Sequence, residues 1–241
     1  MNGVALMAAS SQANWHTDEV RLLTSRRRGI PLGRVSAGTL DTLYAFPRGR
    51  TLRANFVSTV DGGAAGRDGR SGSINTGPDE QIFHRQRALA DAILVGAGTA
   101  LAESYGPARV PLVVVSGRGT LPPTLSSERS GRTILLTSAA SGREDRGDTW
   151  VLGDTEIDFD AALARLASQG MPHVLCEGGP TLFTSLLSQG LVDELAATTA
   201  PRLVAGDGPR MAHGPFVDVP LDLWHLLEED GTLLALWRVR R

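Results

Sequence analysis

The sequence predicts an α/β fold with a mixed, mainly parallel central sheet flanked by helices. Short apolar segments typical of buried strands alternate along the chain with segments of helical apolar spacing, as in strand–helix–strand units. Several of these apolar segments end in glycine just before a helix begins, which is where open α/β sheets bind ligands. The last strand follows residues 226–231 with no helix between, so we expect an antiparallel C-terminal strand at one edge of the sheet.

Caps and breakers support several of the expected elements. Pro78 falls near the first turn of one helix and Pro180 at the first position of another, where proline's missing N–H costs nothing. Asp158 and Asp160 are possible caps of a further helix, and Gly170 would end it. In chain order we expect a strand at 51–60, a helix at 77–90, a strand at 91–96, a short helix from 99, strands at 111–117, 133–138 and, more weakly, 149–153, a helix at 158–170, a strand at 171–176, a helix at 180–190, and strands at 193–204 and 231–241.

The first fifth of the chain is less regular. Residues 1–50 show little alternation, and we expect them to form an N-terminal extension packed on a single domain, residues 51–241. The chain start lacks the basic region and the sustained apolar stretch of a secretory signal. Because the longest apolar runs also fall far short of the ~20 residues that cross a bilayer, we expect a cytoplasmic protein with no membrane span.

Composition excludes several classes of function. The net charge of -2 and the 5% aromatic content give neither a general attraction to nucleic acid nor stacking platforms for its bases. Cys176 is the only cysteine, so a disulfide within the chain and a cysteine-built zinc site are both excluded, and we expect no metal. All 24 basic residues are arginine, which excludes Schiff-base and P-loop lysine chemistry.

The first candidate site is the glycine corner at the end of the expected strand 91–96. Gly96, Gly98 and Thr99 open a helix there, in a geometry that lets the backbone approach a phosphate while the Thr99 hydroxyl binds it or caps the helix. As a dinucleotide fingerprint the corner is incomplete, because Leu101 stands where the third glycine would be. A tight turn without a ligand is the alternative.

The next strand ends in residues that suit NADP. About twenty residues beyond the first corner, an NAD-binding site would carry an acid for the ribose hydroxyl, but here Ser116 and Arg118 follow the strand. A hydroxyl and a guanidinium bind a 2′-phosphate through charge-assisted hydrogen bonds, whereas an acid would repel it. Taken alone, Arg118 could equally mark a surface turn; together with the glycine corner it favours NADP.

The second glycine corner is the segment 174–183. Gly178 and Gly179 follow an apolar strand and Pro180 opens a helix, so backbone amides are expected to point into the ligand crevice. Glu177, at the strand end, either faces the ligand or binds local amides.

A glycine-rich loop follows the first strand of the main domain. Asp61 ends that strand, and five of the twelve residues from 61 to 72 are glycine, which is typical of a lid over a substrate or of a mobile surface loop. In the helix that follows, His84 and Arg85 are expected on a solvated face. Arg87 and Arg109 are candidates for holding a phosphorylated substrate, since the arginine fork matches phosphate geometry.

Three segments taken together resemble a known family. Residues 58–65 (STVDGGAA), 87–104 (RALADAILVGAGTALAES) and 174–206 (beginning VLCEGGPTLF) are similar to the C-terminal reductase domain of the riboflavin-biosynthesis protein RibD, which has a dihydrofolate-reductase-like fold. Residues 43–64 look like the stand-alone members of this group, which carry an N-terminal extension in place of a deaminase. The zinc motif of that deaminase needs several cysteines, so this chain is not expected to deaminate.

The resemblance implies a homodimeric, NADPH-dependent reductase. Its substrate would be 5-amino-6-(5-phosphoribosylamino)uracil or a close pyrimidine, whose ribosyl group becomes a ribityl chain. Positions matching the family motifs would contact cofactor or substrate. With the two glycine corners included, the expected cofactor contacts are Ser58, Gly96, Gly98, Thr99, Glu103, Ser116, Arg118, Gly178, Gly179, Pro180, Thr181 and Leu182, and the expected substrate contacts are Ser71, Arg87, Arg109 and Glu177.

One segment departs from the family pattern. Where the family has an acid and then DPxLxxR, this chain reads ESYGPARVP, with Glu103 in place of aspartate and Tyr105 as an extra aromatic residue. Either Arg109 replaces the missing arginine, or the substrate is not the usual phosphorylated one.

Hydride transfer also requires a proton, and two acids at the sheet edge are candidates for catalysis. We expect Glu177 to orient the pyrimidine, and Asp61 either to deliver the proton or to anchor the lid. Two other functions are kept open at this point. One is dihydrofolate reductase activity on a pterin, and the other is a non-catalytic NADP-binding module.

Overall fold

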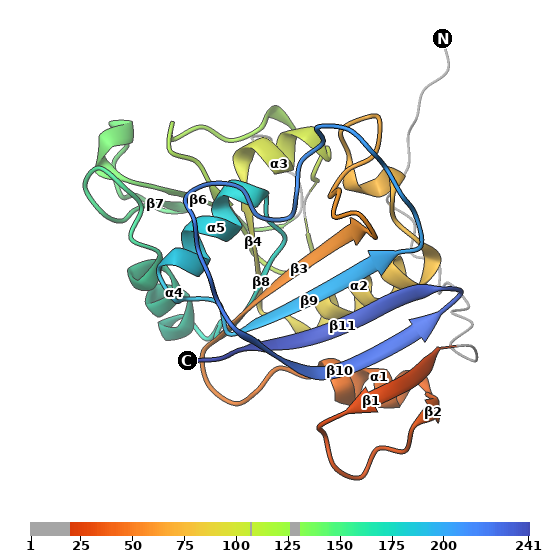
Figure 1. Cartoon of the computed structure of the whole chain (residues 1–241). Helices are drawn as coiled ribbons and strands as arrows, with labels where there is room; N and C mark the ends of the chain where they lie inside the picture. Colours follow the sequence, from red (N-terminus) through yellow and green to blue (C-terminus); the bar gives the residue numbers. More distant parts are fainter. Residues whose placement is uncertain (1–19, 107, 126–130) are drawn as a thin grey trace.

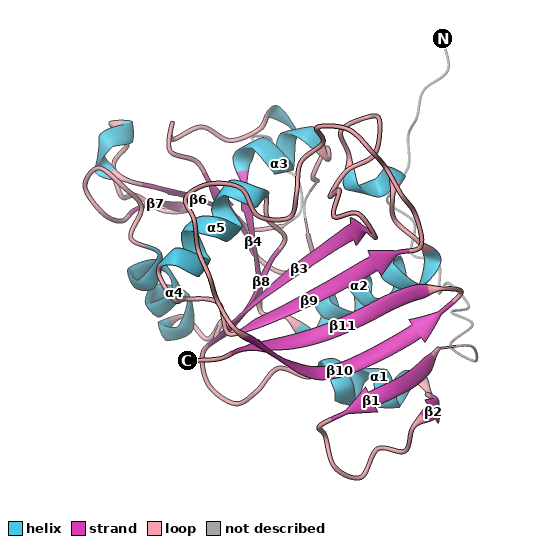
Figure 2. Ribbon diagram, in the orientation of Figure 1, coloured by secondary structure: helices cyan, strands magenta, loops and turns pink. Residues whose placement is uncertain are grey.

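The molecule is built on one mixed sheet. The computed structural model describes residues 20–106, 108–125 and 131–241. Within them, eleven strands lie in the order β2-β1-β10-β11-β9-β3-β8-β4-β5-β6-β7 (Figures 1 and 2). Neighbours from β9 to β7 are parallel, and neighbours from β2 to β9 are antiparallel. The α/β class with a mainly parallel, mixed sheet is confirmed.

The parallel part of the sheet contains the strands that were predicted from residue 51 to residue 204. Their apolar side chains alternate between two buried faces, which explains why they read as nearly continuous apolar runs. In sheet order they are β9 (Glu194–Ala200), β3 (Thr51–Thr59), β8 (His173–Cys176), β4 (Ala92–Gly96), β5 (Leu112–Val115), β6 (Thr133–Thr137) and β7 (Thr149–Val151).

The antiparallel part is larger than the sequence indicated. The last strand, β11 (Thr232–Val239), is antiparallel as expected, but it lies inside the sheet, between β9 and β10 (Leu221–Glu229). Strands β1 (Arg21–Ser25) and β2 (Gly33–Arg34) extend the sheet beyond β10. The pattern missed β10 because a shift in pairing between Leu223 and His225 breaks the alternation of its side chains.

Helices cover both faces of the sheet. The apolar sides of α4 (Phe159–Ser168) and α5 (Pro180–Ser188) share one core with β3 and β8, whereas α1 (Ala37–Tyr44), α2 (Gly77–Leu89) and α3 (Ala97–Ala102) pack on the other face. Strand β4 shows the division, because Leu94 faces the first core and Ile93 and Val95 face the second. In the described part of the chain, short 3-10 helices lie in the connections at Ser71–Ser73, Pro123–Leu125 and Ala139–Ser141.

Local capping explains where two of these helices begin. Asp158 caps α4 by accepting a hydrogen bond from the Ala161 amide at 2.9 Å, whereas Asp160 lies inside the first turn and contributes only its charge. Thr76 caps α2 in the same way through the amide of Asp79. Such caps contribute about 1 kcal/mol each. Gly170, with a φ of +81°, follows the last turn of α4, as predicted.

A buried ion pair joins the neighbouring parallel strands β3 and β9. Arg53 of β3, whose side chain is fully buried, donates to Glu194 Oε2 of β9 from Nη2 at 2.6 Å and from Nε at 3.0 Å. Its third donor, Nη1, reaches the Tyr44 carbonyl at the end of α1. Arg53 therefore ties residues before position 50 to the main domain, alongside the strands β1 and β2.

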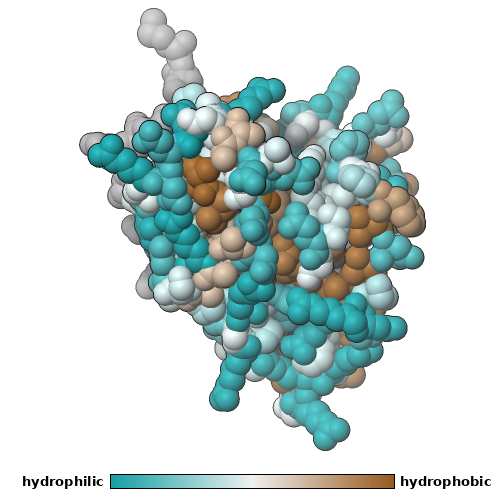
Figure 3. All heavy atoms as spheres, turned by 90° about the vertical axis from the view of Figure 1, so that its left-hand side faces the viewer, coloured by the Kyte–Doolittle hydropathy of each residue, from teal (hydrophilic) through white to brown (hydrophobic). Residues whose placement is uncertain are grey.

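Residues 1–19 lie outside the described part, so the boundary of the N-terminal extension stays a prediction. Within the described residues, no helix combines the length and apolar character that crossing a membrane requires. On the side of the molecule that carries β7 and α4, hydrophilic side chains predominate and apolar ones show in patches between them (Figure 3).

Candidate active site

Two cavities meet at the carboxyl ends of the parallel strands. The first, of about 950 Å³, is lined by the start of α3, the loop after β5 and the start of α5. The second, of about 630 Å³, lies between β3, the loop that follows it, α2 and the segment after α3. Thr99, Gly179 and Pro180 line both cavities, so molecules bound in the two would meet there.

The two glycine corners are hydrogen-bonded to each other. The Gly96 amide donates to the Gly178 carbonyl at 2.7 Å, and the Gly178–Gly179 peptide bond is cis. Gly178 has a φ of +84°, and a Cβ there would lie 2.9 Å from the Phe56 ring. A Cβ on Gly179 would collide with the Thr99 hydroxyl. Glycine is therefore required at both positions by close packing of the strand ends.

The start of α5 points backbone amides at the shared wall. Pro180 occupies the first turn, and no side chain caps the helix at Gly179. The first amides of a helix have no partner within it and carry its partial positive charge, so this end suits an anion. Thr181 and Leu182 of the same turn line the first cavity.

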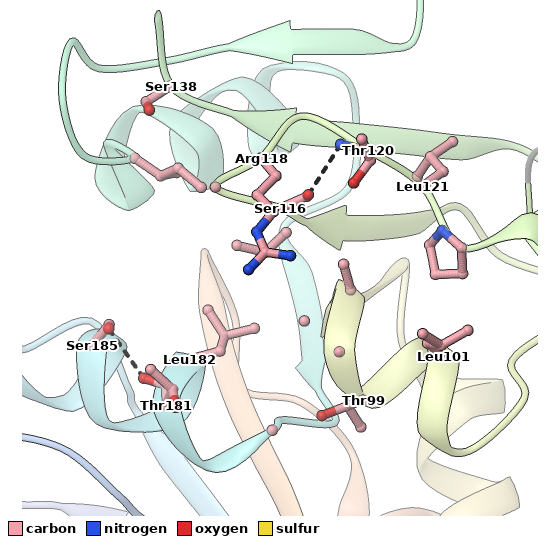
Figure 4. Close-up of a pocket in the computed structure, with 18 of the residues that line it drawn as sticks. Thr99, Leu101, Ser116, Arg118, Thr120, Leu121, Ser138, Thr181, Leu182 and Ser185 are labelled. Carbon is pink, nitrogen blue, oxygen red and sulfur yellow. Dashed lines mark hydrogen bonds between the residues drawn. The ribbon is translucent and has the colours of Figure 1, made fainter. Parts of the chain in front are cut away.

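The loop after β5 forms the opposite wall. The buried Ser116 hydroxyl accepts a hydrogen bond from the Thr120 amide at 3.1 Å, and Arg143 holds the loop through the Gly119 carbonyl at 2.7 Å. Figure 4 shows the Arg118 guanidinium extending from this loop into the space that faces α3 and α5. The cavity thus has a cation on one side and helix amides on the other.

These features fit a phosphate-bearing dinucleotide in the first cavity. Apart from its chain neighbours and the backbone of its own helix, no described residue has an atom within 4 Å of a Cβ placed on Gly98, so the backbone there is open to close approach by a ligand. Ser138, Ile157 and Phe159 add a hydroxyl and apolar surface, and Glu156 adds an acid. Most of the predicted cofactor contacts line this cavity: Gly96, Gly98, Thr99, Ser116, Arg118, Gly179, Pro180, Thr181 and Leu182.

The second cavity contains a cluster of three polar side chains, in which Arg87 and Tyr105 surround Glu177. Arg87 donates to Glu177 Oε1 from Nε at 2.7 Å and to Oε2 from Nη2 at 2.6 Å, and the Tyr105 hydroxyl donates to Oε2 at 2.6 Å. The Arg87 guanidinium also lies 4.4 Å from the centre of the Phe83 ring. Only 2% of the Glu177 side chain is exposed, so its charge is balanced by Arg87 in a nearly dry site.

The protonation of this cluster follows from its burial and its partners. Burial alone would lower the pKa of Arg87, but the hydrogen bond and charge of Glu177 outweigh it and raise that pKa. Burial and then the negative charge of Glu177 hold the pKa of Tyr105 well above its usual value. Both groups therefore stay protonated as donors at neutral pH. In the sequence, Tyr105 was noted only as a departure from the family pattern. In the structure, its hydroxyl donates a hydrogen bond to Glu177.

A second buried acid in this cavity was missed from the sequence. Asp79, in the first turn of α2, is 5% exposed and lines the cavity. Burial raises the pKa of its carboxyl to about 6, although a hydrogen bond with Thr198 acts in the opposite direction. An acid in the first turn of a helix is so common that the sequence carried no signal for this role.

Other predicted contacts are distributed differently. Glu103 lines the second cavity instead of the first, and its Oε1 accepts a hydrogen bond from the Ser71 amide at 2.8 Å. Ser71 and the glycine-rich loop form a wall of that cavity. Two predicted contacts, Ser58 and Arg109, line neither cavity: Ser58 is buried in β3 and Arg109 is exposed. Gly178 borders the shared wall through its bond to Gly179.

Asp61 lies outside both cavities. It is exposed and accepts hydrogen bonds from the Thr59 hydroxyl at 2.5 Å and from the Val204 amide at 3.1 Å. These bonds, with Thr59 contributing most, lower the pKa of its carboxyl. An ionised acid outside the cavity is poorly placed to deliver a proton. Of the two roles expected for Asp61, anchoring the loop after β3 is the one that its contacts support.

Comparison with known proteins agrees with this arrangement. Residues 50–231 match the family model of the RibD C-terminal domain. The 2,5-diamino-6-ribosylamino-4(3H)-pyrimidinone 5′-phosphate reductase of Archaeoglobus fulgidus is 30% identical over 187 residues, which cover 66% of this chain and 84% of that protein. RibD of Mycobacterium tuberculosis is 30% identical over 196 residues, 75% of this chain and 51% of RibD.

A solved structure shows the same fold. The pyrimidine reductase-like protein of Corynebacterium diphtheriae superposes with a TM-score of 0.70 at 23% identity, covering 84% of this chain and 99% of that one. The fold of this chain is therefore shared with a protein of known structure.

Proposed function

Because this chain belongs to the family of the RibD C-terminal domain, we propose that it is an NADPH-dependent pyrimidine reductase of the riboflavin pathway. The reaction converts the phosphoribosylamino group of 5-amino-6-(5-phosphoribosylamino)uracil, or of a close pyrimidine, to a ribitylamino group. One observation carries the proposal: a cavity suited to a dinucleotide and a polar cavity suited to a small ring meet at Thr99, Gly179 and Pro180.

The first cavity supports NADPH as the cofactor. The uncapped start of α5 would hold the pyrophosphate through backbone amides, and Ser116 with Arg118 would hold the 2′-phosphate. When bound, the cofactor supplies the hydride. The protein contributes position, since the wall shared with the second cavity would bring the acceptor carbon to the cofactor and exclude water.

The second cavity supports a pyrimidine as the substrate. The Glu177 carboxylate can accept about four hydrogen bonds, and Arg87 and Tyr105 supply three. One acceptor position on Oε1 is left for a ring N–H. Arg87 and Tyr105 would fix the orientation of the carboxylate, so that the ring is held in one pose beside Thr99.

The substrate phosphate would need basic side chains near the second cavity. Arg109 lies outside the cavities, and Arg87 is paired with Glu177. His84 lies at the half-exposed edge of the second cavity, and with Arg87 it supplies the basic side chains among the described lining residues. We propose that the phosphate lies toward this edge, where water can share its solvation.

Parallel assays test the proposal. The fall in NADPH absorbance is followed with 5-amino-6-(5-phosphoribosylamino)uracil, with its 2,5-diamino-pyrimidinone counterpart, with both compounds after removal of the phosphate, and with dihydrofolate. We expect one or both phosphorylated pyrimidines to be reduced fastest. Consumption of NADPH with dihydrofolate alone would refute the pyrimidine assignment, and no consumption with any compound would refute the enzyme assignment.

Two further properties belong to the same proposal. We expect a homodimer, which light scattering would report as a mass of twice the 25.5 kDa chain. We also expect the protein in the cytoplasm, which fractionation of the source cells would test.

A further inference from the structure

The reduction needs a proton as well as a hydride, and this inference rests on the proposed function. Opening the ribosyl ring and reducing it leaves a hydroxyl where the ring oxygen was. A protein acid that lines the second cavity is placed to supply that proton. The acids that line it are Asp79, Glu80, Glu103 and Glu177.

Three of these acids already contact basic side chains or backbone amides. Glu177 accepts two hydrogen bonds from Arg87. Glu103 accepts a hydrogen bond from the Ser71 amide, and Glu80 Oε1 lies 3.7 Å from His84 Nε2 at the half-exposed edge. Each of these acids thus already pairs with a basic side chain or a backbone amide. Asp79 remains.

Asp79 is placed to face the substrate. It lies four and eight residues before Phe83 and Arg87, so all three project from one side of α2, and all three line the second cavity. Across from it, Thr198 of β9 pairs in register with Val57 of β3, which also lines the cavity. Asp79 thus lies on the same cavity wall as Arg87, the ion-pair partner of Glu177.

The surroundings of Asp79 favour its protonated form. Its partner on β9, Thr198, is neutral, and its neighbour on α2, Glu80, is negative. From α1, Tyr44 is uncharged, because burial raises its pKa. The buried cation on β3, Arg53, is paired with Glu194. Consistent with this setting, burial raises the pKa of Asp79 to about 6.

We propose that Asp79 is the general acid of the reaction and protonates the ribosyl ring oxygen of the substrate. The O–H bond of Asp79 breaks and an O–H bond forms on the ring oxygen, which keeps the electron pair of its broken bond to C1′. C1′ gains the hydride that NADPH supplies, and NADP⁺ is released. Asp79 is left as a carboxylate and regains a proton from water.

The first test is Asp79→Asn, assayed with the phosphoribosylamino-pyrimidine from pH 5 to 9. In the wild type, kcat should fall as the pH rises above about 6, because the acid form is then lost. The variant should lose roughly 100-fold or more in kcat and should lose this pH dependence, while NADPH binding stays unchanged. The matched control is Asp160→Asn, which alters an exposed first-turn acid of α4 that lines neither cavity and should change neither property.

Thr198→Val separates an acid from a structural residue. The hydrogen bond with Thr198 lowers the pKa of Asp79, so removing it should move the fall in kcat to higher pH and raise kcat at pH 8 relative to pH 6. A merely structural role would produce no such shift.

Three results would overturn the inference. The first is an Asp79→Asn variant that retains the wild-type kcat and pH profile. The second is an increase in KM alone in that variant, which would make Asp79 a binding residue. The third is a Thr198→Val variant whose pH profile is unchanged. Each of these outcomes leaves the proposed function intact, whereas a wild-type protein that oxidises no NADPH with the pyrimidine refutes the function and the inference together.

Discussion

Arg87 and Glu177 are joined by two parallel hydrogen bonds of 2.7 and 2.6 Å, although 90 residues separate them in the chain. The pair links helix α2 to the end of strand β8, at the point where the second cavity approaches the first. Such forked pairs fix orientation as well as charge. Glu177 is therefore held rigidly where the substrate ring is expected.

We expect Glu177→Gln to lower kcat/KM for the pyrimidine by roughly 10- to 100-fold, the range for a lost charged hydrogen bond. Glutamine has the same size but leaves the Arg87 charge unbalanced. The affinity for NADPH, measured by fluorescence titration, should be spared. Undiminished turnover would exclude Glu177 from catalysis.

Tyr105→Phe should raise KM for the pyrimidine by roughly tenfold, because one donor to the Glu177 carboxylate is lost. The ring, 5.3 Å from the Arg87 guanidinium, stays in place. Since the pKa of Tyr105 is raised well above 10, the wild type should show no loss of activity from its ionisation up to pH 9. Steady-state kinetics of wild type and variant across pH 6 to 9 check both statements. A variant with lowered kcat at unchanged KM would contradict the first, and a wild-type loss of activity toward pH 9 that disappears in Tyr105→Phe would contradict the second.

Arg118→Ala should weaken NADPH binding by roughly 10- to 100-fold and leave NADH binding unchanged, because the guanidinium is expected to meet the 2′-phosphate. Titration of both dinucleotides provides the measurement. Arg132→Ala, which removes an exposed arginine paired with Asp148, is the control and should change neither affinity. Equal losses for the two dinucleotides would place the 2′-phosphate elsewhere.

Gly98→Ala should weaken NADPH binding while the protein becomes slightly more stable. In the described part of the chain, a Cβ at this position meets no atom within 4 Å beyond its neighbours and its own helix backbone, so it would project into space needed by the cofactor. Alanine within a helix also stabilises it by roughly 0.5–1 kcal/mol relative to glycine. Thermal unfolding and NADPH titration of one preparation would show the opposite directions, and unchanged affinity would remove the cofactor from this corner.

Acid should destabilise the fold through His225. This side chain is fully buried with its ring 4.9 Å from that of Tyr44, and its nitrogens have no hydrogen-bond partner among the described residues. Burial, and then the charges of Arg53 and Arg27, lower its pKa from 6.5 to about 3. Because the unfolded chain binds the proton first, stability is full above pH 6.5 and is lost as the pH falls toward 3.

Between pH 7 and pH 5, this effect of His225 lowers the free energy of unfolding by about 2 kcal/mol. Urea unfolding of the wild type and of His225→Phe at both pH values would measure it, with a smaller loss expected in the variant. Asp79 acts with the opposite sign. Because its pKa is raised in the folded protein, its contribution to the free energy of unfolding is full below pH 3.8 and is lost as the pH rises to about 6. Since both proteins contain Asp79, this contribution cancels when they are compared. Equal losses in wild type and variant would contradict the role of His225.

Much of the parallel sheet could be predicted because its signals are local. Strands β4, β5, β6 and β8 are short apolar runs bounded by polar or glycine residues, and each glycine corner is a contiguous motif. The antiparallel strands β1 and β10 were missed because register shifts interrupt the β1–β10 and β10–β11 pairings, and β2 was missed because it contains only two residues. A shift of one residue moves side chains to the other face and erases the alternation that marks a strand.

The sequence by itself determined the α/β class and the two glycine corners, and it singled out Ser116 and Arg118 as candidate NADP contacts and Glu177 as a candidate catalytic residue. These depend on residue type and short spacing. Only the tertiary structure decided that Tyr105 and Arg87 hold Glu177, that Asp61 lies outside the cavities, and that Asp79 is a buried acid within one. The reason is physical: the pKa and the partners of a side chain are set by burial and by groups from distant segments, which no local pattern records.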